Sequence, residues 1–145
     1  MTPIEIAKYV FREEGVNWEW HGSKKKYGNV VQAKQRSMWL IRQICPKMTF
    51  REIGKIFSTD SSNVITACKR INNYIETSKC DMQVMSSYYK EITGEEIEST
   101  TVSKSGDNYL LAIKSLKNGK IIQEKLEISD KVFKIIVHEY KMICE

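Results

Sequence analysis

A run of small polar residues between two apolar segments contains the side chains best placed to do chemistry. The run covers residues 59–63, and a basic pair, Lys69 and Arg70, follows within two helical turns. Hydroxyl, carboxylate and carboxamide groups make hydrogen bonds, and the basic pair adds positive charge. Such a set suits the binding of a polar, anionic partner.

Patterns for catalysis or for metal binding are missing from the sequence. The two histidines, His21 and His138, lie far apart, and the four cysteines include no Cys-x-x-Cys pair. No Gly-x-x-x-x-Gly-Lys-Ser/Thr loop is present to hold the phosphates of ATP. We therefore expect no enzyme, no metal site and no cofactor or nucleotide.

Two helices joined by a short turn are predicted to hold the polar run. Thr49 and Glu52 have the spacing of a capping box, which starts the first helix, and Asp60 caps the second. Buried stripes are predicted at Phe50, Ile53, Ile56 and Phe57 in the first helix, and at Val64, Ala67, Cys68 and Ile71 in the second. This leaves Ser61, Ser62, Asn63, Thr66 and Lys69 facing outward.

This pair is the plan of a helix-turn-helix, in which the start of the second helix faces base edges in the DNA major groove. The same spacing also suits plain helix packing in an all-α domain. Charge favours the first interpretation. Residues 1–80 carry 14 Lys or Arg against 7 Asp or Glu, whereas residues 81–145 carry 9 against 11, so the half that would face a polyanion is N-terminal.

Three further helices are predicted around this pair. The first starts at Thr2-Pro3, ends near Gly15 and has an apolar face of Ile4, Ala7 and Phe11. A loop with Trp18 or Trp20 folded onto the core leads to a helix over residues 30–44, whose polar residues are Lys34, Gln35, Arg36 and Arg42 and which Cys45-Pro46 ends. The second helix of the pair continues to residue 77, and another covers residues 82–92 before Thr93-Gly94.

Beyond residue 94 the pattern changes to one of strands. Three segments have either alternating polar and apolar residues or a continuous apolar run, which predicts strands over residues 98–103, 108–116 and 120–128. Asn118-Gly119, between the last two, is a strong hairpin signal. Ser129-Asp130 then caps a last helix over residues 131–144, whose Val132, Phe133, Ile136, Val137 and Tyr140 could cover one sheet face. The predicted fold is α+β, with a helical domain over residues 1–94 and an antiparallel meander plus helix over residues 95–145.

Three blocks of residues follow one another in the order found in a known family. They are Val30-Val31-Gln32-Ala33-Lys34-Gln35 with Met38 and Leu40, then Glu52-Ile53-Gly54 with Phe57, then Val64 through Ala67-Cys68 to Ile71. With them, residues 4–75 resemble domain IV, the C-terminal DNA-binding domain, of the bacterial replication initiator DnaA. The resemblance covers about half of the chain and leaves residues 82–145 unexplained.

The resemblance implies roles for individual residues. In that family an arginine of the first block enters the minor groove, and an Arg-Asp-His-Thr-Thr run reads the major groove. These roles correspond here to Lys34 and to Thr59, Asp60, Ser61, Ser62 and Asn63. The family's basic loop, which touches phosphates, corresponds to Lys24, Lys25 and Lys26, while Lys55, Thr66 and Lys69 complete the predicted DNA-binding set.

The chain also departs from the family pattern. Only Asp60 keeps the family's residue in the reading run, and the turn after Phe57 is about one residue shorter than the usual Phe-Gly-Gly. Asparagine suits adenine, serine does not discriminate, and lysine cannot reproduce the planar fork of arginine. We therefore expect the docking mode to persist and the target sequence to differ.

The resulting hypothesis is a sequence-specific protein that binds double-stranded DNA in bacterial or phage replication or transcription control, without ATPase activity. Residues 95–145 would form a homodimer or bind a protein partner. With no membrane span or signal peptide in the sequence, the expected location is the cytoplasm, at the nucleoid. The alternatives are an adaptor that keeps the helical fold without DNA readout, and an enzyme hidden in residues 95–145.

Overall fold

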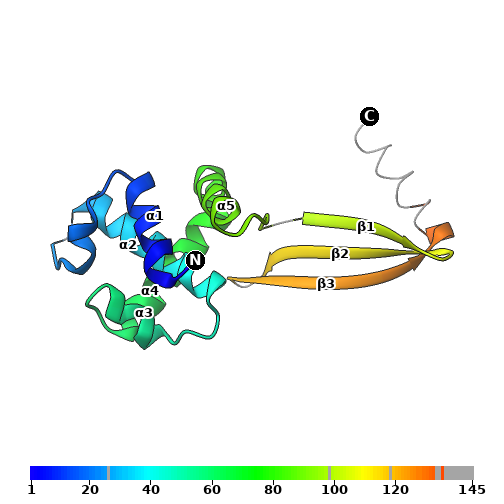
Figure 1. Cartoon of the computed structure of the whole chain (residues 1–145). Helices are drawn as coiled ribbons and strands as arrows, with labels where there is room; N and C mark the ends of the chain where they lie inside the picture. The colour runs from blue at the N-terminus through cyan, green and yellow to red at the C-terminus, as the bar shows by residue number, and fades with distance from the viewer. Residues whose placement is uncertain (26, 98, 118, 133–134, 136–145) are drawn as a thin grey trace. The chain divides into compact units, whose positions relative to one another are not determined.

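The chain forms two compact units, Met1–Glu96 and Ile97–Glu145, in a computed structural model (Figure 1). The structure describes all residues except 26, 98, 118, 133–134 and 136–145. The first unit is helical and the second contains an antiparallel sheet, which confirms the predicted α+β class.

The helical unit contains five α-helices and one short 3-10 helix in its described residues. Their bounds are α1 Pro3–Glu13, η1 Trp18–Gly22, α2 Gly28–Ile44, α3 Phe50–Ile56, α4 Ser61–Thr77 and α5 Lys79–Thr93. Predicted caps start most of them: Thr2 and Glu5 form a full capping box on α1, the Thr49 hydroxyl accepts from the Glu52 N–H, and Asp60 caps α4. Gly94, with φ of +74°, ends α5.

The core lies where α1, α2, α3 and α4 meet. Trp39 is fully buried at its centre, and its indole N–H donates to Asn72 Oδ1 at 2.6 Å. The predicted stripe of α4 is confirmed, since Val64, Ala67, Cys68 and Ile71 are all buried. The apolar face predicted for α1 was wrong at one position: Ile4 is 48% exposed, because the helix turns Ile6, Ala7, Val10 and Phe11 inward instead.

The structure corrects two further predictions. The segment predicted to be a connecting loop contains η1, which Asn17 caps by accepting from the Glu19 N–H. Trp18 packs edge-on against Phe11 at 5.1 Å between ring centres, in agreement with the prediction that Trp18 or Trp20 folds onto the core. Helix α5 starts at Lys79 rather than Met82, because the Ser78 hydroxyl accepts from the Asp81 N–H and begins the new helix directly after α4.

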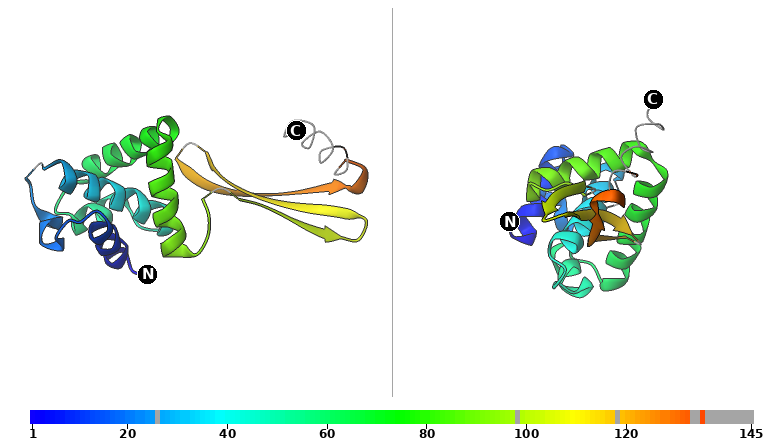
Figure 2. Two further views of the ribbon diagram at one scale, coloured as in Figure 1. Left: turned by 90° about the horizontal axis from the view of Figure 1, so that it is seen from above. Right: turned by 90° about the vertical axis from the view of Figure 1, so that its right-hand side faces the viewer.

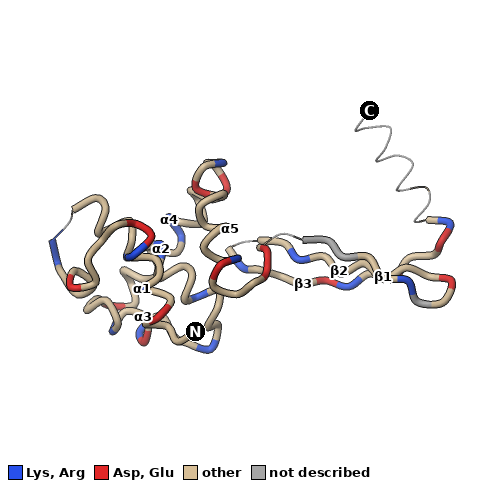
Figure 3. The backbone as a smooth tube through the Cα atoms, turned by 45° about the horizontal axis from the view of Figure 1, so that its top comes forward, with Lys and Arg blue, Asp and Glu red and all other residues tan. Residues whose placement is uncertain are grey.

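The second unit is a meander of β1 Ser99–Ser105, β2 Asn108–Lys117 and β3 Lys120–Ser129, in the order β1-β2-β3 (Figures 1 and 2). Lys117 pairs with Lys120, so a two-residue connection joins β2 and β3, as predicted. Basic and acidic residues lie next to one another on β3, an edge strand (Figure 3). Such charges disfavour uncontrolled edge-to-edge pairing.

The predicted last helix begins as expected, with the Ser129 hydroxyl accepting from the Val132 N–H at 3.4 Å. Val132 itself is 44% exposed. Phe133, Ile136, Val137 and Tyr140, which were predicted to cover the sheet, lie outside the described residues. Within the described part of the chain, no helix has the length and apolar character needed to cross a membrane.

Candidate nucleic-acid interface

A tight turn sets the angle between α3 and α4. The Thr59 N–H donates to the Gly54 carbonyl at 3.0 Å, which folds the chain back over the end of α3. A Cβ on residue 54 would lie 2.6 Å from the Thr59 carbonyl oxygen, so the turn requires glycine there. Ser58 takes a left-handed conformation, with φ of 54°, at the apex.

The first turn of α4 presents the predicted polar run in a fixed arrangement. Asp60 Oδ1 accepts from the Asn63 N–H at 2.9 Å, and Asn63 Nδ2 donates to Thr59 Oγ1 at 2.7 Å. Ser61 and Ser62 are exposed beside them. The carboxylate of Asp60 therefore acts as a helix cap, which by itself explains an aspartate at this position.

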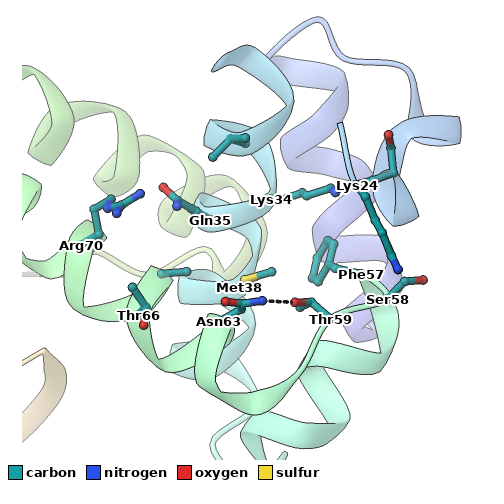
Figure 4. Close-up of a pocket in the computed structure, with 13 residues that line it drawn as sticks. Lys24, Lys34, Gln35, Met38, Phe57, Ser58, Thr59, Asn63, Thr66 and Arg70 are labelled. Carbon is teal, nitrogen blue, oxygen red and sulfur yellow. Dashed lines mark hydrogen bonds between the residues drawn. The ribbon is translucent and has the colours of Figure 1, made fainter. Parts of the chain in front are cut away.

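A groove of about 540 Å³ runs between α2 and the exposed side of α4 (Figure 4). It brings together five of the predicted DNA-binding residues, which come from the loop before α2, from α2, from the turn and from α4. These are Lys24, Lys34, Thr59, Asn63 and Thr66. Basic and neutral polar groups share its walls, so the groove can both attract an anion and donate or accept hydrogen bonds.

Lys34 lies at one wall of this groove, where its amine donates to the Ser23 carbonyl. Burial lowers the pKa of Lys34, since the charged ammonium loses water there. The contact ties α2 to the loop that precedes it. Lys34 thus holds the basic loop in place as well as lining the groove.

The basic loop itself is only partly described. Lys24 is exposed and lines the groove, while the Lys25 ammonium lies 5.6 Å from the ring centre of Trp20 and is also exposed. Lys26 lies outside the described residues. The described lysines of this loop present charge to solvent, as phosphate contacts require.

The other predicted residues are exposed but do not line the groove. They are Lys55 on α3, and Asp60, Ser61, Ser62 and Lys69 at α4. Arg42 has a different position: it donates to the Met48 carbonyl at 2.7 Å, and its guanidinium lies 4.4 Å from the ring centre of Phe50. It therefore stabilises the connection between α2 and α3.

Sequence reasoning missed several groove residues. The predicted site lacks four residues that line the groove, namely Gln35, Met38, Ser58 and Arg70. The signal for Arg70 is helical spacing, because Asn63, Thr66 and Arg70 follow one another at three and four residues on one face of α4. The α2 residues carried no such signal, since they meet α4 only in the fold.

Helices α3 and α4, with the tight turn between them, form a helix-turn-helix. The described residues contain no group of three or more His, Cys, Asp or Glu side chains that could hold a metal ion. The model of the bacterial DnaA protein helix-turn-helix family matches residues 3–71, which confirms the predicted resemblance to that family over this part of the chain. A comparison with curated proteins found no match to the chain.

Proposed function

We propose that this protein binds double-stranded DNA at specific sequences and acts in bacterial or phage replication or transcription control. The observation that carries the proposal is the groove, in which α2 and α4 bring Lys34, Asn63 and Arg70 to one surface of a DnaA-type helix-turn-helix. The 145 residues contain no phosphate-binding loop, so we propose that they act without hydrolysing ATP. Binding DNA would place the protein at the nucleoid, in the cytoplasm.

Selection from a random duplex pool, followed by anisotropy titrations, tests this function. We expect one sequence class to be enriched, and we expect log affinity to fall with log salt by about 0.9 per phosphate neutralised. Lys34→Ala should weaken binding, whereas Lys79→Ala, which removes an exposed lysine at the start of α5, should not. If no sequence is enriched and the two variants bind alike, specific readout is wrong.

We further propose that residues 95–145 pair with a second copy of the chain. Val102, Leu111 and Leu126 form one cross-strand row over all three strands, and Val102 and Leu126 are 49% and 52% exposed. In a two-fold symmetric dimer, the same surface of each copy packs against the other. The identical apolar row on a second copy would therefore cover this row, sheet face against sheet face.

Light scattering across a concentration series tests the pairing. We expect the wild type to form a dimer, and we expect Leu126→Lys to dissociate that dimer. Gln123→Lys, on the opposite face of β3, should leave the dimer intact. A monomer at all concentrations, or a dimer unaffected by Leu126→Lys, would overturn this part of the proposal.

The second candidate function is an adaptor that keeps the helical fold but has lost DNA readout. It is favoured by the substituted run at residues 59–63, in which the one family-like residue, Asp60, caps α4. A protein partner that stays bound after nuclease treatment and at high salt, together with no affinity for duplex DNA, would establish the adaptor instead.

A further inference from the structure

Asn63 is held at two points in the first turn of α4. Its backbone N–H donates to Asp60 Oδ1 at 2.9 Å, and its side-chain Nδ2 donates to Thr59 Oγ1 at 2.7 Å (Figure 4). Asn63 is exposed and lines the groove. Its carboxamide is therefore oriented before any ligand arrives, so less rotamer entropy is lost on binding.

The contact with Thr59 leaves hydrogen-bonding capacity on the same carboxamide. An asparagine side chain carries two N–H donors and an acceptor oxygen, and Thr59 takes one donor. The remaining donor and acceptor form the pair that adenine matches in the major groove, with N7 accepting and the N6 amino group donating. Guanine offers two acceptors there, so it does not match.

Within the first turn of α4, the residues next to Asn63 do not supply an equal source of discrimination. Ser61 and Ser62 carry hydroxyls that accept and donate alike, and the Lys34 amine is engaged with the Ser23 carbonyl. In residues 61–67 only Asn63 carries a carboxamide. The start of α4 therefore has one side chain with a fixed donor and acceptor.

We propose that Asn63 reads an adenine in the major groove and that Thr59 is its positioning residue. The inference rests on the proposed function, since it names the base that the same surface recognises. It assigns base discrimination to a residue at which the chain departs from the reading run of its family.

The experiment compares base preferences rather than total affinity. The wild type and Asn63→Ala are each used to select sites from a random duplex pool, with Asn73→Ala, an exposed asparagine later on α4, as the matched control. We expect the wild type and the control to prefer A·T at one position by about 5- to 150-fold. Asn63→Ala should lose that preference.

Replacing that adenine by 7-deazaadenine, which removes the N7 acceptor, should weaken the wild type and leave Asn63→Ala unchanged. Thr59→Val should reduce the preference at the same base pair and no other. Should Asn63→Ala retain every base preference of the wild type, the inference fails and the proposed function stands. Should the wild type enrich no sequence, the inference and the proposed function both fail. Circular dichroism of each variant checks that a lost base preference does not come from unfolding.

Discussion

At the scale of single residues, Arg36 is a buried charge that two carboxylates hold. Its guanidinium is 2.6 Å from Glu14 Oε1 and 3.1 Å from Asp81 Oδ1, and the Tyr88 hydroxyl donates to the other Glu14 oxygen at 2.9 Å. Burial opposes the charge of Arg36, but the two carboxylates outweigh it, so the pKa of Arg36 is raised. One buried cation thereby joins α1, α2 and α5.

Removing this cation should be costly because it leaves the Glu14 carboxylate without the positive charge that compensates it. We expect Arg36→Met to lower the free energy of unfolding by about 3 kcal/mol. The double variant Arg36→Met with Glu14→Gln should recover much of the loss, because no uncompensated charge remains at Glu14. Urea unfolding at neutral pH measures both values, and equal stabilities for the single and double variants would contradict the argument.

Cys68 provides a prediction about pH. Burial raises the pKa of the Cys68 thiol to about 11, with Arg42 opposing the shift. From pH 9 to 11 the unfolded chain releases the thiol proton and the folded chain keeps it, so stability falls as pH rises. The loss reaches at most about 3 kcal/mol for this group.

The measurement is urea unfolding at several pH values between 8 and 11, with Cys68→Ala compared with the wild type. The variant should be less stable at pH 8, because it removes a buried atom, yet its stability should fall less steeply with pH. Other groups that titrate in this range are common to both proteins and cancel in the comparison. Parallel profiles would show that Cys68 does not contribute.

At the scale of the elements, the turn between α3 and α4 decides how α4 is presented. Gly54→Ala would place a methyl group 2.6 Å from the Thr59 carbonyl oxygen, so we expect a loss of about 1–3 kcal/mol and weaker DNA binding. Ser58→Gly should instead add about 1 kcal/mol, because glycine adopts the left-handed conformation without strain. Thermal unfolding of both variants tests whether the backbone of the turn is strained at Ser58, where φ is positive.

Much of this arrangement was predictable from spacing alone. The apolar positions of α3 and α4 recur every three or four residues, and Asp60 and Thr49 mark where the helices begin. Arg36 was not predictable as a buried residue, because periodicity places charges outward and its partners lie 22 and 45 residues away. The lining of the groove was only partly predictable for the same reason, because α2 and α4 come together only through tertiary packing.

At the scale of the whole molecule, the helical unit is longer than the family match. The match ends at residue 71, whereas α5 supplies Asp81 and Tyr88 to the network around Arg36. Met85, Tyr88 and Tyr89 of α5 are also buried. Helix α5 is therefore part of the domain rather than a linker to the sheet.

This extension predicts the behaviour of two fragments. Residues 1–96 should fold cooperatively, whereas residues 1–78 should be much less stable, because Arg36 loses one carboxylate and Glu14 loses the Tyr88 hydroxyl. Circular dichroism during heating distinguishes the two. Equal melting temperatures would show that α5 adds nothing to the domain.

Two tryptophans of the helical unit, Trp39 and Trp20, lie in different surroundings, so intrinsic tryptophan fluorescence can be used as a probe of ligand binding. Trp39 is fully buried and hydrogen-bonded to Asn72, so its emission should not respond to a ligand at the surface. Trp20 carries the Lys25 ammonium 5.6 Å from its ring centre. A phosphate that draws this ammonium away changes the electrostatic field at the Trp20 indole. Unlabelled protein can therefore report, by fluorescence, when its basic loop meets a polyanion.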